Sequence, residues 1–265
     1  MKKLLLFLLL SLLLVSCKKE KKEDKQPPQP AKVTLVSKNT HTEKGSIYTI
    51  NYTYDSKHRL INKHYSTGLN NEYTYDATGN VIKFKEYHDE SVGDRDSTVY
   101  TFVYQNGLPK TGVESKIYKG KAFSTGEITY EVSNNRVTKI TLKINKFEFY
   151  YSVTYDAAGN METIKSPIGY GVSTGTYSYS DKKNPFYNSR PKFLVWVLQL
   201  DFYSPNNVKS TEYVDERGSS KTEHTTTFDA NGFPTSDLVK GTETFVDGTV
   251  TVENTTDTYE YITAQ

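Results

Sequence analysis

Apolar and polar residues alternate along most of the chain. From Phe147 to Tyr155, within Lys146–Asp156 (KFEFYYSVTYD), every second residue is aromatic or apolar, and most residues between them are polar. Thr138–Ile144 (TKITLKI) repeats the pattern. Because side chains alternate between the two faces of a strand, both segments predict β-strands with one apolar-aromatic face and one polar face. Further strands are predicted at Gly45–Tyr54, Val81–His88, Ser97–Tyr104 and Val250–Ile262.

A short turn follows an aromatic or apolar residue at nearly regular intervals. The residues before these turns are Tyr54, Tyr75, Tyr104, Val132, Tyr155, Tyr179, Tyr203 and Phe228, spaced 21 to 29 residues apart. Each interval holds two strands and two turns, so the repeating unit is a β-hairpin. The pattern predicts an all-β, single-domain antiparallel meander of about 16 strands over residues 32–265. A sheet of this length curls, and it removes its exposed edges if it closes, so we leave open whether the barrel-like sheet is open or closed.

The turns contain residues that bond to their own backbone or tolerate positive φ. We assign structural turn roles to Asp55, Asp76, Asp156, Asp229, Gly79, Gly159, Asn206 and Asn207. An Asp at the first turn position accepts a hydrogen bond from the backbone two residues on, and Gly-Asn accepts positive φ. The alternative, in which these aspartates are catalytic or metal-binding carboxylates, is less favoured because the turn already explains them.

The first 16 residues are predicted to form a signal peptide, and the single cysteine of the chain follows them. Lys2 and Lys3 precede the apolar run Leu4–Val15, which suits a secretory signal and is short for a membrane span. Leu14–Cys17 (LVSC) resembles the lipobox of bacterial lipoproteins, which implies a signal peptide at residues 1–16 and lipidation of Cys17 after cleavage. The alternative is an ordinary signal peptide with an incidental cysteine. Residues 17–31 are predicted to be a flexible tether, because they are Lys-rich and end in a Pro-rich stretch.

Composition narrows the function classes. The 265 residues carry a formal charge of +2 and one Cys, which excludes a disulfide scaffold. Lys2 and Lys3 account for that charge, so the lipidated chain is neutral. A nucleic-acid-binding protein needs a basic stripe, and the sequence shows none. Glu23-Asp24 after the tether lysines resembles the export signal of surface-exposed Bacteroidetes lipoproteins, although a merely solubilising tether explains it equally well.

Two family resemblances follow from these motifs. Tyr75–Val81 (YDATGNV) and Tyr155–Met161 (YDAAGNM) resemble the Tyr-Asp-x-x-Gly-Asn hallmark of the Rhs or YD-repeat family, and the other copies are degenerate. Together with the lipobox and an insertion between Lys183 and Asn207, they resemble more closely a family of Bacteroidetes lipoproteins of unknown function. That resemblance covers roughly residues 32–262 and implies a porin-like β fold. It implies no activity and no catalytic residue.

A segment near residues 184–203 departs from the alternating pattern. Lys192–Tyr203 (KFLVWVLQLDFY) is apolar on both faces and follows two X-Pro breaks. We expect it to pack inside the sheet as an apolar plug, with Phe193, Trp196 and Leu198 as its main side chains, because a wide barrel is not filled by its own side chains. The pattern leaves helix and strand open, with a slight preference for helix.

A search for chemistry finds no catalytic, metal or cofactor motif. The histidines, which are His41, His58, His64, His88 and His224, lack zinc-ligand spacing, and no G-x-S-x-G or phosphate-binding loop is present. The acidic loop Asp89–Asp96 lacks the spacing of a calcium-binding loop and is interpreted as solvated. Most tyrosines are interpreted as packing pairs across strands, although tyrosine also suits sugars and lipids.

The favoured function is therefore a non-enzymatic binding or structural scaffold. It is anchored by lipid to the outer membrane, at the periplasmic face or the cell surface. Its expected partners are the membrane through the anchor and a glycan, a lipid or an envelope protein, with no cofactor. A lipophile carrier that uses the aromatic face is the alternative. An integral outer-membrane porin is disfavoured by the charged residues within strands such as Val81–His88, and an unrecognised glycan hydrolase is a more distant option.

Overall fold

The computed structural model describes residues 32–89, 96–168, 171–196 and 203–264, and Val33–Ala264 form one compact unit. Its first eight strands are β1 (Val33–Glu43), β2 (Ser46–Tyr54), β3 (Leu60–Tyr65), β4 (Leu69–Tyr75), β5 (Val81–His88), β6 (Ser97–Gln105), β7 (Leu108–Tyr118) and β8 (Lys121–Ser133). The remaining strands are β9 (Arg136–Ile144), β10 (Phe147–Tyr155), β11 (Met161–Ile168), β12 (Gly171–Lys183), β13 (Asn206–Asp215), β14 (Gly218–Phe228), β15 (Pro234–Phe245) and β16 (Val250–Ala264). Among the described residues, no helix is long and apolar enough to cross a membrane.

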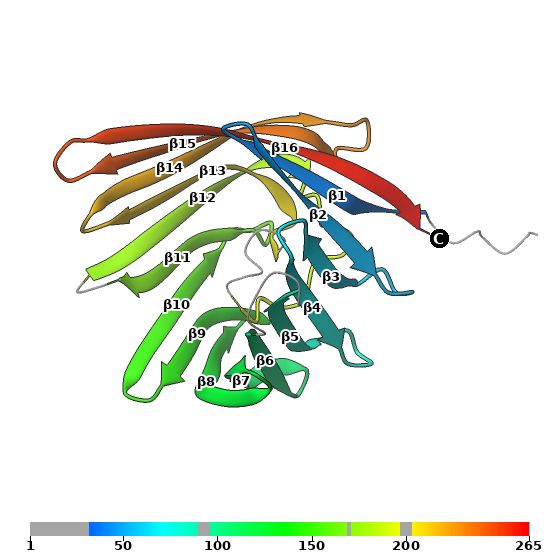
Figure 1. The fold of residues 1–265 in the computed structure, drawn as a ribbon, viewed down its shortest axis with the longest axis vertical. Coiled ribbons are helices and arrows are strands. Elements are labelled where there is room, and N and C mark those ends of the chain that lie inside the picture. Colours follow the sequence, from blue (N-terminus) through cyan, green and yellow to red (C-terminus); the bar gives the residue numbers. More distant parts are fainter. Residues whose placement is uncertain (1–31, 90–95, 169–170, 197–202, 265) are drawn as a thin grey trace, which may run out of the picture. The chain divides into compact units, whose positions relative to one another are not determined.

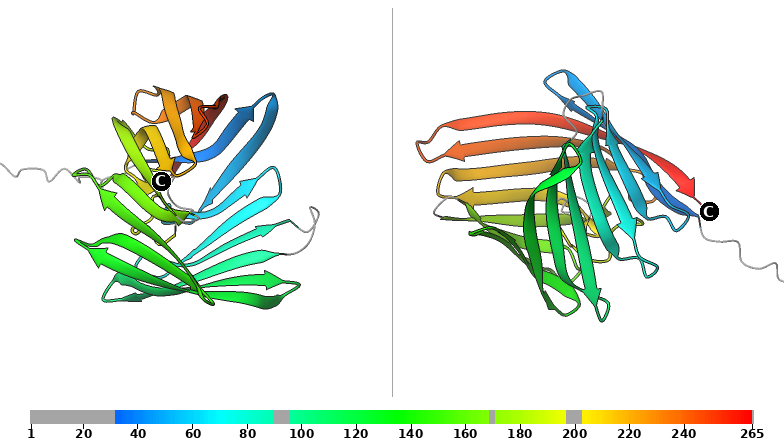
Figure 2. Two further views of the ribbon diagram at one scale, coloured as in Figure 1. Left: turned by 90° about the vertical axis from the view of Figure 1, so that its left-hand side faces the viewer. Right: turned by 60° about the horizontal axis from the view of Figure 1, so that its bottom comes forward.

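The strands form a closed antiparallel barrel in which each strand pairs with the next one along the chain. β16 pairs with β1 from Val33–Ala264 to Glu43–Thr255, and this pairing closes the sheet (Figure 1). Figure 2 shows the consecutive hairpins side by side around the wall. The predicted meander of about 16 strands is confirmed, and of the two forms left open the sheet takes the closed one. Closure pairs the two edge strands, which would otherwise expose unpaired backbone groups.

The antiparallel order gives the barrel two distinct ends. The near end is where β1 begins and β16 ends, and it carries the turns after the even-numbered strands, such as Asp76–Asn80 between β4 and β5. The far end carries the turns after the odd-numbered strands, such as Lys44–Gly45 between β1 and β2. The Tyr-Asp turns of the sequence repeat therefore all lie at the near end.

Buried apolar side chains fill part of the lumen. The core includes Leu60, Ile140 and Met161, which are almost wholly inaccessible and lie in the near-end halves of their strands or at their middle. Phe193–Trp196, from the segment between β12 and β13, belong to the same core cluster. We call Phe193–Trp196 the plug. Its burial confirms that the apolar insertion packs inside the barrel.

Aromatic contacts hold the plug against several strands. The Trp196 ring lies 4.9 Å from Tyr100 of β6, and the Phe193 ring lies 6.2 Å from Tyr104, between ring centroids. Tyr130 of β8 donates a hydrogen bond to the carbonyl oxygen of Val195 at 2.8 Å. Lys192–Trp196 form neither helix nor strand, so the preference for helix is wrong for these residues. A segment that is surrounded by the barrel wall buries side chains on every side, so its apolar residues need not follow the period of a helix or a strand. Leu198 lies outside the described residues.

The apolar face of the strands is not covered along its whole length. Phe147 and Phe149 share a face with buried Val153 on β10, as alternation predicts, but they are 69% and 43% exposed. They stand at the far-end start of β10, beyond the reach of the plug. The alternation of apolar and polar residues therefore predicts correctly which face of the sheet a residue is on. It does not predict which part of that face the plug covers.

Six tyrosines in the near-end halves of even-numbered strands form a ladder of hydrogen bonds. The hydroxyls of Tyr54, Tyr75, Tyr104, Tyr155, Tyr179 and Tyr261 donate to the backbone carbonyls of Val36, Leu60, Val81, Val137, Met161 and Pro234, at 2.7 to 2.9 Å. These six residues are the tyrosine ladder. In five of the six bonds the acceptor is the first or second residue of an odd-numbered strand. The exception is Val36, which lies further into β1. Each such tyrosine therefore ties its own strand to the strand before it in the sequence.

Candidate functional site

The aspartates predicted at turns all bond to their own turn backbone. Asp76 Oδ1 accepts hydrogen bonds from the backbone N–H groups of Thr78 and Asn80, both at 2.9 Å. Burial alone raises the pKa of Asp76, but these bonds and those from the Thr78 and Asn80 side chains outweigh it and lower the pKa to about 2. The carboxylates of Asp55, Asp156 and Asp229 accept equivalent backbone bonds from Arg59, Asn160 and Phe233. Their positions are fully explained by turn formation.

The remaining predicted residues divide into three groups. Gly79 and Gly159 adopt φ values of +88° and +92°, which an L-residue with a side chain rarely takes. Asn206 and Asn207 were predicted at a turn, whereas they open β13, because the segment 184–205 connects β12 to β13 in place of a tight turn. The backbone N–H of Asn184 donates to Pro205 and closes the base of that segment. Cys17 lies outside the described residues.

A cavity of about 350 Å³, lined by both polar and aromatic side chains, lies beside the segment between β12 and β13, and we call it the lumenal pocket. Its polar side chains include Asn39, His41, Asn207, His224, Asp237 and Asp257. Its aromatic side chains are Tyr48, Tyr52, Tyr177, Phe186 and Tyr259. Phe186 comes from the segment between β12 and β13, and its ring meets Tyr52 edge-on at 5.1 Å. The volume falls within the range of about 300–1,000 Å³ typical of small-molecule sites.

Asp257 anchors one side of this pocket. Its Oδ1 accepts hydrogen bonds from Asn39 Nδ2 and His41 Nδ1, each at 3.1 Å. An ionised carboxylate only accepts hydrogen bonds, so His41 carries its proton on Nδ1 when it is neutral. His41 Nε2 is then left as an acceptor, and Glu43 Oε2 lies 3.9 Å from it.

Asp237 anchors the other side through a second pair. His224 Nδ1 lies 2.6 Å from Asp237 Oδ2, and Thr226 Oγ1 donates to Asp237 Oδ1 at 2.9 Å. Asn207 Nδ2 donates to Thr226 Oγ1 at 3.1 Å, which continues the network onto β13. Asp237 is only 5% exposed, so these bonds compensate for the burial of its charge.

Strand order brings the two pairs together. His224, Asp237, Asp257 and His41 belong to β14, β15, β16 and β1, which are consecutive neighbours in the barrel wall. Asp237 is the register partner of Asp257, and Asp257 is also the partner of His41. Side chains of directly opposed residues share one face, about 4.5–5.5 Å apart at Cβ. The pairing of β15 with β16 therefore places two carboxylates side by side, and the barrel closure brings His41 beside them.

The two carboxylates affect the tyrosines around them. The pKa of Tyr259 is raised well above its ordinary value, first by burial and then by the negative charges of Asp257 and Asp237. The pKa of Tyr48 is raised by burial and then by Asp257. Within the described part of the chain, no hydrogen bond reaches the Tyr259 hydroxyl. The pocket thus offers a partly buried tyrosine hydroxyl beside two carboxylates.

The chemistry open to the pocket is recognition through hydrogen bonds and charge. A histidine bonded to a carboxylate can act as a base when a substrate proton lies within reach. A metal site needs more converging ligands, and within residues 32–89, 96–168, 171–196 and 203–264 no group of three or more His, Cys, Asp or Glu side chains could hold a metal ion.

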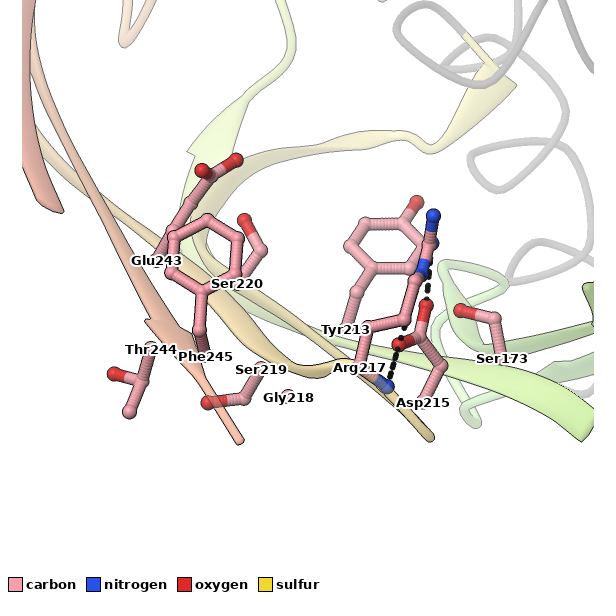
Figure 3. Close-up of a pocket in the computed structure, with 10 residues that line it drawn as sticks. All are labelled: Ser173, Tyr213, Asp215, Arg217, Gly218, Ser219, Ser220, Glu243, Thr244 and Phe245. Carbon is pink, nitrogen blue, oxygen red and sulfur yellow. Dashed lines mark hydrogen bonds and ion pairs between the residues drawn. The ribbon is translucent and has the colours of Figure 1, made fainter. Parts of the chain in front are cut away.

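A second cavity, of about 440 Å³, lies at the far end, and we call it the mouth pocket (Figure 3). Its charged residues include Asp215, Arg217 and Glu243. Figure 3 shows Arg217 paired with Asp215, with Arg217 Nη2 2.7 Å from Asp215 Oδ2. The Arg217 backbone also donates to Asp215 in the β13–β14 turn, so this pair has a structural role. The hydroxyls of Tyr213 in the mouth pocket and Tyr177 in the lumenal pocket are hydrogen-bonded, so the two cavities adjoin.

The lumenal pocket was missed from the sequence. His41 and His224 were noted as scattered histidines without zinc-ligand spacing, and Asp237 and Asp257 were not singled out. The sequence feature that indicates the pocket is a set of polar residues at inward positions of strands, such as Asn39 and His41 on β1. That signal is weak, because His41 and Asp257 are 216 residues apart and meet only when the barrel closes.

Comparisons with known proteins give a fold and no family. No protein-family model matches the sequence, and no curated protein matches it. A crystallised porin-like protein from Bacteroides uniformis is similar in structure, with a TM-score of 0.55 and 15% sequence identity, over 86% of this chain and 96% of that one. A chain of the TcdB2–TccC3–Cdc42 complex matches with a TM-score of 0.31 and 12% identity, over 88% of this chain and 14% of that one. The first likeness shows that the chain has a porin-like β-barrel fold.

Proposed function

We propose that this protein is a lipid-anchored protein of the cell envelope and a non-enzymatic binding scaffold, with its ligand in the lumenal pocket. The observation that carries the proposal is the pocket itself. The plug and the core fill part of the lumen, whereas the space beside β14, β15, β16 and β1 is left open and lined by ordered polar side chains. Clefts and cavities lined by apolar and aromatic side chains, with a few oriented polar groups, are the usual form of small-molecule sites.

The outer wall supports anchoring by lipid over insertion of the strands. Outward positions on β14 carry Lys221, Glu223, Thr225 and Thr227, all exposed. β8 is similar, with exposed Thr125, Glu127, Thr129 and Glu131. Transmembrane barrels instead present an apolar band to lipid. We therefore assign membrane attachment to the acyl chains on Cys17 and place the strands in water.

The lining of the pocket also bears on the alternative of a lipophile carrier. Such a carrier needs an empty apolar cavity, but Phe193–Trp196 pack into the apolar core of the lumen. The space that remains contains Asp237 and Asp257. Desolvating these carboxylates against a hydrocarbon ligand would be costly, so a polar ligand suits the pocket better.

Filling the pocket should abolish binding. Thr211 of β13 lines the lumenal pocket, so we expect Thr211→Trp to occupy its space and remove any bound small molecule. Native mass spectrometry of the full chain, incubated with a metabolite extract of the cells that produce it, checks this. The matched control is Thr225→Trp at an exposed outward position of β14, which should retain the ligand. Equal occupancy in wild type and Thr211→Trp would argue against the lumenal pocket as the site.

The anchor is tested separately. We expect Cys17→Ser to abolish incorporation of labelled palmitate and to move the protein from the membrane fraction to the soluble fraction, because a serine hydroxyl does not form the thioether. Fractionation and metabolic labelling measure both effects. A conservative change in the tether, Lys18→Arg, should leave both unchanged. If the Cys17→Ser protein stayed membrane-bound, the strands or a partner would have to supply the attachment.

A further inference from the structure

The permanently charged side chains of lysine and arginine are missing from the described lining of the lumenal pocket, whereas two carboxylates are present. Asp237 and Asp257 are its two carboxylates, and the described residues that line it include no lysine or arginine. His41 and His224 bond to these carboxylates through Nδ1 and add positive charge only if they are protonated. With neutral histidines, the pocket therefore favours a cation and disfavours an anion.

Aromatic rings form the rest of the lining. Tyr48, Tyr52, Tyr177, Phe186 and Tyr259 come from β2, β12, β16 and the segment after β12. The faces of aromatic rings carry negative charge density and attract ammonium groups, more strongly where water is excluded. Tyr259 lines the cavity and is only partly buried, and a tyrosine hydroxyl can accept a hydrogen bond from a ligand.

We propose that the lumenal pocket binds a small organic cation, an amine or a quaternary ammonium compound, between its aromatic rings and the carboxylates of Asp237 and Asp257. This inference rests on the proposed binding function and names its ligand class. A neutral sugar would use the hydroxyl and amide groups but would leave the negative charge uncompensated. The Asn39, Thr226 and histidine bonds hold both carboxylates in place before a ligand arrives, so little ordering is needed on binding.

The test is calorimetric titration of the full lipid-free chain, in detergent-free buffer at neutral pH, with choline as the probe. The control ligand is its uncharged carbon analogue, in which a tert-butyl group replaces the trimethylammonium group. We expect choline to bind at least about tenfold more tightly than the analogue. Wild-type protein suffices for this comparison, so it does not depend on a variant that folds.

Two variants test whether a carboxylate of the lumenal pocket is responsible for choline binding. Asp257→Asn should weaken choline binding by about tenfold or more. Asp215→Asn removes a carboxylate of the mouth pocket and should leave choline binding unchanged. Circular dichroism confirms that each variant is folded.

The outcomes separate this inference from the proposed function. If choline failed to bind, or bound no better than its neutral analogue, the organic-cation assignment would be overturned. A neutral metabolite that is lost on Thr211→Trp would leave the binding function standing while rejecting the cation. If no metabolite were displaced by Thr211→Trp, the proposed function itself would fail.

Discussion

Trp196→Ala is expected to lower the free energy of unfolding by about 3–5 kcal/mol. Trp196 is 6% exposed and packs against Tyr100 and Tyr151, with ring centroids 4.9 and 6.4 Å away. Removing the indole leaves a cavity. The surrounding strands are held in place by backbone hydrogen bonds to their neighbours, so they close this cavity only in part. For a domain of this size, the loss corresponds to a fall in Tm of about 10 °C. Urea denaturation followed by circular dichroism measures it.

The control for the plug is Tyr187→Ala, in the same inter-strand segment. Tyr187 is exposed, so its truncation should change the free energy of unfolding by less than about 1 kcal/mol. If Trp196→Ala cost no more than Tyr187→Ala, the plug would not fill the lumen in solution.

Simultaneous Tyr75→Phe, Tyr104→Phe and Tyr155→Phe substitutions should cost about 3–5 kcal/mol in total. Each change removes a hydroxyl that donates to the carbonyl of Leu60, Val81 or Val137 and leaves the carbonyl without that donor. The packing volume hardly changes, so the loss measures the hydrogen bonds. Tyr118→Phe, at an exposed far-end position outside the ladder, should be neutral. A triple variant as stable as wild type would show that the ladder contributes nothing.

The ladder also predicts sensitivity to alkali. Burial raises the pKa of Tyr179 to about 12 and raises the pKa of Tyr75, Tyr104 and Tyr155 as well. Because the folded-state values lie above the unfolded value of about 10, the stabilisation is complete below pH 10 and is lost as pH rises through the folded-state values. The urea midpoint of wild type should therefore fall steeply above about pH 10. The triple Phe variant should show a shallower fall.

The strands and their order could be predicted because both depend on local patterns. The two-residue period of Phe147–Tyr155 defines a strand, and the recurrent Tyr-Asp turns define how strands connect. The plug was also predictable, because a segment that is apolar on all sides, as at Phe193–Trp196, has to be buried. These inferences use neighbours in sequence, and the closed barrel retains those neighbours in space.

The candidate site could not be predicted because it depends on long-range register. His41 meets Asp257 only through the pairing of β1 with β16, and no local pattern specifies that pairing. The ladder acceptors are similarly hidden, since the Tyr104 hydroxyl reaches the Val81 carbonyl across a hairpin. Phe147 shows that a local pattern also has limits. The pattern predicts the face of the sheet on which Phe147 lies but not that its side chain is exposed.

The most direct test of the lumenal pocket as a binding site is the histidine side-chain NMR spectrum during a choline titration. The chain has five histidines, and only His41 and His224 line the lumenal pocket among the residues that the structure describes. We predict that the imidazole signals of these two residues shift with choline, whereas those of His58, His64 and His88 do not. Shifts confined to the other three histidines, or no shift at any of the five, would contradict the account.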